Sequence, residues 1–227
     1  KDLAKTIKVF YESFANKKKQ PALIMKTSGA GYSILDREDT LTKIKSIKSQ
    51  FPADWKLPNV YLLHGDLSSE EMNYLYNHPK IKAFISLTHG EGYGRPLQEA
   101  TMTGLPVIAS NWSGHLDFLD KENSILIDGN MVQVPKSMTW KDIIVKQSQW
   151  FVVDETKVHK ALDYTVENQI EIKNKAKTLM HVNRNNLPSQ GQLNLPKLKK
   201  INKNEEKNLP KLKLPKLKKI TGEGATV

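Results

Sequence analysis

The sequence predicts an α/β fold in which a parallel β-sheet is covered by helices. Five apolar runs of four or five residues alternate with longer segments whose apolar residues recur at helical spacing. Short apolar strands between helices are typical of parallel sheets that are buried on both faces. The chain has 227 residues, of which 38% are hydrophobic, so it is long enough for one domain and an additional polar segment.

The elements can be followed in order from the amino terminus. Residues 2–16 carry apolar side chains at every third or fourth position, which predicts an amphipathic helix. Pro52 ends the second expected helix, and Ser68 with Glu71 forms a capping box at the start of the third. We expect helices over 2–16, 39–51, 68–77, 98–103, 139–150 and 155–181, and strands over 22–25, 60–63, 83–87, 106–109 and 124–127.

Most of the positive charge lies in the last part of the chain. Residues 187–227 contain ten Lys and three acidic residues, so +7 of the net +11 lies there and +4 elsewhere. The segment Leu195–Ile201 recurs as Leu214–Ile220 with Pro in each copy, and this composition cannot bury a core. We expect residues 186–227 to form a disordered basic repeat tail, which could contact an anionic membrane or nucleic acid. The remaining chain gives no sign of nucleic-acid binding.

Composition excludes several other classes of protein. The absence of Cys rules out disulfides, thiolate zinc sites and cysteine nucleophiles. No run approaches the roughly 20 apolar residues that cross a bilayer, and the chain does not start with a signal peptide. We therefore expect a cytoplasmic protein, which the basic tail could bring to the membrane surface. Because the initiator Met is missing, we also expect the chain to be cut from a longer one.

The segment 88–100 carries the candidate site. It contains three alternating glycines between an expected strand and an expected helix, where parallel sheets bind their ligands. Glycines let the backbone approach a ligand closely, and free N–H groups at a helix start favour an anion such as a diphosphate. Glu91 and Glu99 are eight residues apart, and each carboxylate could accept hydrogens from two sugar hydroxyls.

A glycine-rich turn alone allows other interpretations. It is not a P-loop, because no Gly-Lys-Ser/Thr follows. Gly90, Gly92 and Gly94 also lack the spacing of a dinucleotide-binding fingerprint. From these residues alone, a turn with a purely structural role stays open.

The wider sequence resembles a known family. The stretches Glu91-Gly-Tyr-Gly-Arg-Pro-Leu-Gln-Glu99-Ala, Gly104-Leu-Pro-Val-Ile-Ala109 and Ser113-Gly114 are together similar to the Glu-x7-Glu signature of glycosyltransferase family 4 and its relatives, the group 1 glycosyltransferases. Gly65-Asp66-Leu67-Ser68 resembles the family's base-binding loop. Trp150 resembles the family's tryptophan, and Asp154 resembles the start of its last helix. The resemblance covers about residues 1–181.

The resemblance implies the carboxyl-terminal, donor-binding half of a GT-B enzyme, with a Rossmann-like parallel sheet flanked by helices. Residues 1–154 would form this nucleotide-sugar-binding domain without its first, central strand. Residues 155–185 would form the helix that crosses back over the protein, and residues 186–227 the tail. The amino-terminal half, which holds the acceptor, is absent, so we expect a fragment that needs this missing domain as its partner.

The resemblance also implies roles for individual residues. Glu91, the catalytic candidate, would hold hydroxyls of the transferred sugar, and Glu99 would hold those of the ribose. Lys1 would neutralise the diphosphate unless it is a frayed end, and Lys26 is the second candidate for that role. The other donor-binding candidates are His89, Gly90, Gly92, Tyr93, Gly94, Arg95, Gly65 and Leu67.

Simpler explanations exist for some residues near these motifs. His89 borders the site, but the sequence is also consistent with a histidine that has no function there. We interpret His64 as structural. We interpret Trp112, Trp140 and Trp150 as packing residues rather than as platforms for a sugar.

The implied reaction is a retaining transfer from a nucleoside diphosphate sugar to a glycan, a lipid or another acceptor, as in polysaccharide biosynthesis. It needs no protein nucleophile and no cofactor, and without an Asp-x-Asp motif no metal is indicated. Positioning and charge stabilisation of the leaving diphosphate would carry the catalysis. The alternative is a non-catalytic subunit with the same fold, acting as a scaffold or binding module.

Overall fold

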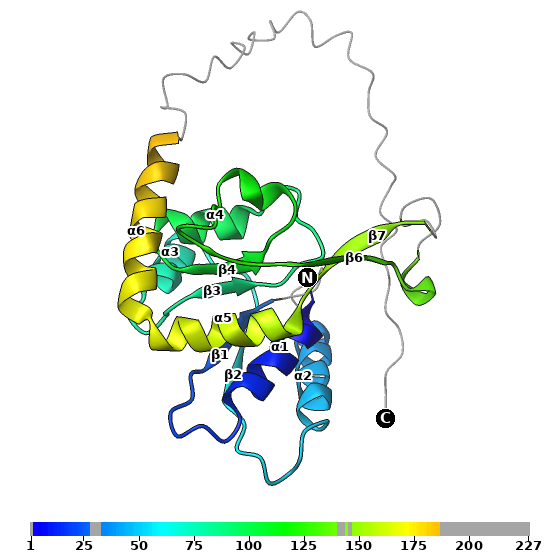
Figure 1. Cartoon of the computed structure of the whole chain (residues 1–227). Coiled ribbons are helices and arrows are strands. Elements are labelled where there is room, and N and C mark those ends of the chain that lie inside the picture. The colour runs from blue at the N-terminus through cyan, green and yellow to red at the C-terminus, as the bar shows by residue number, and fades with distance from the viewer. Residues whose placement is uncertain (1, 28–32, 140–143, 145–146, 187–227) are drawn as a thin grey trace, which may run out of the picture. The chain divides into compact units, whose positions relative to one another are not determined.

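The computed structural model describes residues 2–27, 33–139, 144 and 147–186, which form an α/β domain (Figure 1). The expectations for Lys1, Trp140 and the tail over 187–227 concern residues outside this part of the chain. Among the described residues, no helix combines the length and apolar character needed to span a membrane.

Five strands follow the apolar runs of the sequence. β1 (Leu23–Lys26) pairs in parallel with β2 (Val60–Leu63), while β3 (Phe84–Ser86), β4 (Val107–Ser110) and β5 (Ile125–Ile127) form a second parallel group. The predicted α/β class is therefore confirmed. The sheet is divided, however, because no strand pairing joins the two groups within the described residues. The missing central strand stays a prediction.

Helices bury the strands on both faces. α1 (Leu3–Phe14), α2 (Ile34–Lys48) and α5 (Glu155–Glu167) share one buried cluster with Ile108. α3 (Ser69–Asn77), α4 (Arg95–Met102) and α6 (Gln169–Asn186) share another with Val107 and Ala109. Successive side chains of a strand point to opposite faces, so Ile108 points to one face of β4 and Val107 and Ala109 point to the other. The two clusters therefore lie on opposite sides of β4.

A hairpin replaces one expected helix. Residues 139–150 were expected to be helical, and this is wrong at Gln149 and Trp150. β6 (Gly129–Gln133) and β7 (Gln149–Val153) pair antiparallel, and the turn Lys136–Met138 lies between them. The run from Trp150 to Val153 is aromatic and β-branched, which favours a strand. Gly129 permits the close pairing, since a Cβ there would lie 2.0 Å from the carbonyl oxygen of Val152.

The last helical segment is two helices rather than the single one expected over 155–181. α5 ends at Asn168, whose backbone leaves the helical region at φ −114° and ψ 38°. The side-chain amide of Asn168 donates to the carbonyl oxygen of Tyr164 at 3.0 Å. The backbone N–H of Asn168 donates to the same carbonyl at 2.9 Å, and α6 begins immediately afterwards.

Helix α6 holds the carboxyl-terminal end of α4. The buried Asn183 amide donates to the Thr101 hydroxyl at 3.0 Å and to the Phe118 carbonyl at 3.2 Å. Arg184 donates twice to the Met102 carbonyl, at 3.2 and 2.7 Å, and Lys173 donates to the Gly104 carbonyl at 2.7 Å. These contacts fix α4 from behind and so position its amino-terminal end.

Candidate functional site

The glycine-rich bend joins β3 to α4 at the carboxyl end of the strand. Gly94 is the residue that precedes α4, with φ +85°, a backbone conformation that favours glycine. A Cβ at Gly94 would also lie 3.0 Å from His115 Cβ, so the chain passes close to its neighbour. Within the described residues, no side chain caps α4 at this end. Pro96 has no N–H, and the N–H groups of Leu97 and Gln98 donate to the Gly94 carbonyl at 2.8 and 3.1 Å. In the first turn of α4, the helix therefore leaves the Arg95 N–H for another acceptor.

Ser113 and Gly114 clamp this bend. The Ser113 hydroxyl accepts from the Glu91 N–H at 3.0 Å and donates to the Glu91 carbonyl at 2.6 Å. The N–H of Gly114 donates to the same carbonyl at 3.1 Å. A Cβ at Gly114 would lie only 1.8 Å from the Gly92 carbonyl oxygen. In the sequence analysis, Ser113 and Gly114 contribute only to the family resemblance. Their role in holding the bend was not predicted.

Both carboxylates of the bend are half-buried. Glu99 lies one turn into α4 and accepts from Arg95 Nε at 2.8 Å. The Arg95 side chain is 82% exposed, so this pair is at the surface. Below it, burial together with the nearby Glu99 charge raises the pKa of Tyr76 to about 12. The Tyr76 hydroxyl donates weakly to the Pro96 carbonyl at 3.5 Å.

Tyr93, between the two carboxylates, has a half-exposed ring that leans on Phe118, with ring centres 5.2 Å apart. Its hydroxyl accepts a hydrogen bond from the Gln98 side chain. The ring is therefore tied both to the first turn of α4 and to the segment after β4.

His89 connects the bend to the hairpin. Its Nδ1 lies 2.7 Å from the Phe151 carbonyl oxygen, and its own carbonyl accepts from the Phe151 N–H at 3.2 Å. The imidazole stacks on Trp150, with ring centres 4.1 Å apart and planes within 8°. Because a carbonyl only accepts, Nδ1 carries a hydrogen, and Nε2 faces the Asp2 carboxylate at 3.7 Å. His89 is thus held in one orientation, with Nδ1 as a donor.

A narrow hollow adjoins His89. Asp2, Lys5, Thr88 and Phe151 also line it. The buried Thr88 hydroxyl has no hydrogen-bond partner within the described part of the chain. The N–H of Asp2 donates to the Leu87 carbonyl at 3.2 Å, which places the start of α1 beside the end of β3.

The expected base loop follows β2. Lys26, the last residue of β1, donates to the Gly65 carbonyl at 2.6 Å. Gly65 has φ +103°, and the N–H of Leu67 donates to Asp66 at 3.1 Å. Lys26 therefore shapes this loop through its contact with Gly65. His64, at the end of β2, lies 2.7 Å from Asp36 of α2, as its structural interpretation expects.

The candidate residues lie at the carboxyl ends of strands in both groups. Parallel strands end on the same side of their sheet, so the loop after β2 lies at the carboxyl edge of one group and the bend after β3 at the carboxyl edge of the other. The first edge carries Lys26, Gly65 and Leu67, and the second carries His89, Gly90, Glu91, Gly92, Tyr93, Gly94, Arg95 and Glu99.

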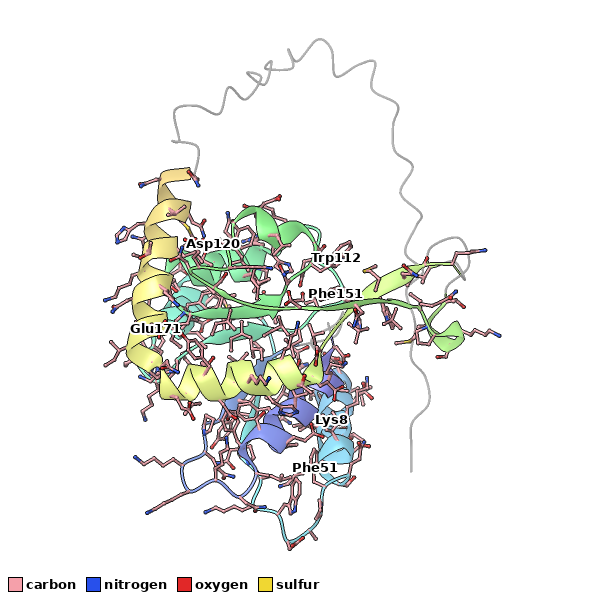
Figure 2. All side chains as sticks on the ribbon, viewed as in Figure 1. Lys8, Phe51, Trp112, Asp120, Phe151 and Glu171 are labelled. Carbon is pink, nitrogen blue, oxygen red and sulfur yellow. The ribbon has the colours of Figure 1, made fainter. Side chains whose placement is uncertain are left out.

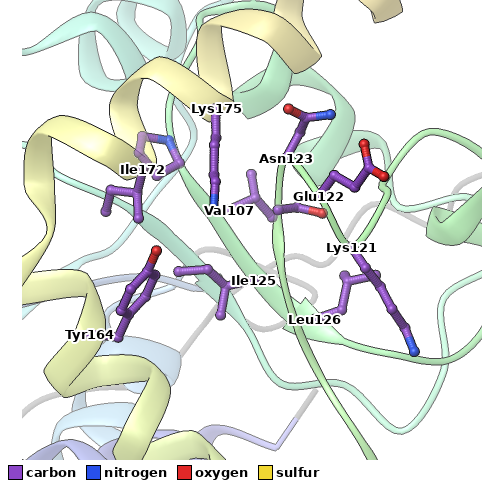
Figure 3. Close-up of a pocket in the computed structure, with 11 residues that line it drawn as sticks. Val107, Lys121, Glu122, Asn123, Ile125, Leu126, Tyr164, Ile172 and Lys175 are labelled. Atoms are coloured by element: carbon purple, nitrogen blue, oxygen red, sulfur yellow. The ribbon is translucent and has the colours of Figure 1, made fainter.

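A hollow of about 250 Å³ lies at a different place (Figure 3). Pro106 and Ser124, at the amino ends of β4 and β5, line it together with Tyr164, Ile172 and Lys175. The amino ends are opposite the edge at which open α/β sheets bind their ligands. This hollow is therefore separate from the candidate donor site.

Comparisons with known proteins give a sequence family and several solved structures. Residues 3–146 match the sequence family described as Glycosyl transferases group 1. No curated protein matches the chain. Solved structures do match it. One is the C-terminal domain of a glycosyl transferase group 1 family protein (LpcC) from Francisella tularensis, at 16% identity and a TM-score of 0.53, covering 80% of this chain and 78% of that chain.

Another solved match is Anabaena Alr3699/HepE. Its structure with UDP and glucose gives 13% identity and a TM-score of 0.53, and its structure with UDP-glucose gives 13% identity and a TM-score of 0.52. Each match covers 79% of this chain and 40% of that chain. At such identities the likeness shows a shared fold, and this chain spans less than half of the HepE length.

Proposed function

The chain belongs to the group 1 glycosyl transferases, and from this premise we propose that its carboxyl edge binds a nucleoside diphosphate sugar. The observation that carries the proposal is the bend itself. A backbone clamped by Ser113 leads into a helix start without a side-chain cap, between two half-buried carboxylates. The backbone N–H groups of Gly92, Tyr93, Gly94 and Arg95 would suit the distal phosphate, and the carboxylates suit sugar hydroxyls.

Each part of the donor would have its own contacts. Glu91 would hold hydroxyls of the transferred sugar. Glu99 would give up its ion pair with Arg95 and bind the ribose hydroxyls instead. The released Arg95 guanidinium would then be free to contact the diphosphate. The loop of Gly65 and Leu67 would meet the base through backbone groups. His89 would contact the sugar end of the site through Nε2.

The proposed reaction is a retaining transfer. The acceptor hydroxyl attacks the anomeric carbon from the face that the diphosphate leaves. The new C–O bond forms as the bond between the anomeric carbon and the diphosphate oxygen breaks, and the proton of the acceptor hydroxyl passes to an oxygen of the leaving diphosphate. The Arg95 N–H at the start of α4 and the Arg95 cation would stabilise the negative charge on the leaving diphosphate, in place of a divalent metal. Holding the acceptor hydroxyl against the anomeric carbon on that same face would supply the remaining rate enhancement.

The acceptor would be held by a second domain, as expected for a two-domain GT-B enzyme. The 40% coverage of HepE supports this, because a larger protein of the same fold contains this part together with more chain. We therefore expect no transfer by residues 1–227 alone. Binding that never leads to transfer, even with an acceptor domain supplied, would instead favour the non-catalytic scaffold.

Thermal stabilisation by nucleotides tests the donor site. UDP and UDP-glucose are the first probes, followed by the guanosine and adenosine equivalents, each with and without EDTA. A ligand at a hundred times its Kd should add about 2.7 kcal/mol to the free energy of unfolding. Glu99→Ala should abolish this response and EDTA should leave it unchanged.

Glu171→Ala is the matched control for this experiment. Glu171 also forms an exposed pair with a cation four residues away, Lys175, but on α6. It should therefore keep the full nucleotide response. If Glu99→Ala responds as the wild type does, Glu99 is not in the site.

A further inference from the structure

Trp112 presents an aromatic surface next to the candidate site. It lies two residues beyond the end of β4, and its indole stacks on the Phe151 ring with centres 5.9 Å apart and planes within 11° (Figure 2). Phe151 is buried and is bonded to His89 through its backbone. Trp112 nevertheless leaves 44% of its surface exposed. The expected packing role therefore accounts for only part of this side chain.

The backbone of Trp112 is fixed relative to Glu91. The next residue, Ser113, bonds both the N–H and the carbonyl of Glu91. Ser113 has φ +88°, a conformation that is costly for a residue other than glycine, by about 1–3 kcal/mol. Such strain persists only where surrounding contacts enforce it. Trp112 and Glu91 are thus carried by one rigid unit at the carboxyl edge.

The two side chains offer complementary chemistry to a sugar. A pyranose ring has hydroxyls around its edge and C–H groups on its faces. A carboxylate binds the hydroxyls, and the negative face of an indole attracts the C–H groups, which carry a slight positive charge. A single sugar ring could therefore meet Glu91 at its edge and the exposed indole of Trp112 at a face.

We propose that Trp112 is a platform for the transferred sugar of the donor, with Phe151 holding the indole in place. This inference rests on the proposed function, and it adds a residue that selects for the sugar rather than for the nucleotide. Removing the indole should weaken binding of the nucleotide sugar while leaving binding of the bare nucleotide unchanged.

The test compares UDP with UDP-glucose, and GDP with GDP-mannose, by calorimetry. For the pair that binds the wild type, the ratio of the two Kd values measures the gain due to the sugar. In Trp112→Ala this gain should fall about three- to tenfold, the size expected for one aromatic contact. Trp112→Phe should keep part of the gain, because a smaller ring remains.

Trp55 provides the matched control. It is 38% exposed and leans on Phe51, with ring centres 6.0 Å apart, and Phe51 lies well apart from Trp112 in Figure 2. Trp55→Ala should leave the sugar-dependent gain unchanged. Circular dichroism checks that each variant is folded.

The possible results separate the two proposals. An unchanged gain in Trp112→Ala, or an equal loss of affinity for nucleotide and nucleotide sugar, overturns the platform alone. A wild type that binds no nucleotide overturns the proposed function, and the platform with it.

Discussion

The two ends of helix α4 differ in how many side-chain contacts they receive from the rest of the protein. At its carboxyl end, Arg184 and Lys173 of α6 donate to the carbonyls of Met102 and Gly104. At its amino end, Gly94 provides no side-chain cap, and the first residue is a cation, Arg95. A cation there is unfavourable for the helix dipole, whereas cations near the carboxyl end are favourable.

The contrast separates stability from binding within one helix. Protein groups satisfy the carboxyl end, so changes there should alter the free energy of unfolding and leave nucleotide binding intact. The amino end leaves the Arg95 N–H for a ligand, so changes there should alter binding. The clamp residues are the exception, because they support the amino end through backbone contacts.

Gly114→Ala should have the largest effect. Its new Cβ would lie 1.8 Å from the Gly92 carbonyl oxygen, so the bend must move or the chain must unfold. We expect a loss of more than about 4 kcal/mol in the free energy of unfolding, measured by urea denaturation. Gly92→Ala is the control, since a Cβ there meets nothing within 4 Å. Equal stabilities for the two variants would show that the clamp is not tight.

Asn183→Ala should come next, at the opposite end of α4. It leaves the Phe118 carbonyl and the Thr101 hydroxyl without their buried partner. The expected loss is about 2 kcal/mol in the free energy of unfolding. The nucleotide response should be unchanged once each measurement is referred to the variant's own melting temperature. A lost nucleotide response would contradict the separation of the two ends.

Tyr76→Phe should show an effect that depends on pH. Because the folded protein raises the pKa of Tyr76 to about 12, folding favours the neutral phenol. This contribution is fully present below pH 10 and is lost as pH rises towards 12. The wild type should therefore lose about 1 kcal/mol more than Tyr76→Phe between pH 9 and pH 11. Parallel denaturation curves over that range would place Tyr76 in a more open environment.

Arg184→Met should have the smallest effect. The substitution keeps an aliphatic side chain but removes two surface hydrogen bonds to the Met102 carbonyl. We expect a loss of about 0.5 kcal/mol at low salt, shrinking as salt is added. Thermal melts at two salt concentrations measure it, with Lys160→Met on α5 as a control for loss of a surface cation.

The sequence predicted the elements whose signals are local. The apolar run at Val60–Leu63 became β2, and the capping box of Ser68 and Glu71 formed as expected. Alternating glycines marked the bend between β3 and α4. In each case the deciding residues are neighbours in the chain, so spacing alone carries the information.

The elements that were missed depend on distant contacts. Ser113 reaches Glu91 across 22 residues, and only the fold brings them together. The hairpin strand β7 is fixed by the stacking of Trp150 on His89 and by pairing with β6. Helical spacing over 139–150 could not reveal these contacts. Asn168 was a local signal for the break between α5 and α6, and it was overlooked.

The divided sheet has a consequence for how a ligand would act on the domain. The loop proposed to bind the base follows β2, in one strand group, and the bend follows β3, in the other. A nucleotide sugar bound as proposed would therefore bridge two parts that share a core but no strand pairing among the described residues. Hydrogen exchange of the backbone amides of Ile24 and Ile85 would then slow together, because the bound donor would contact both strand groups at once.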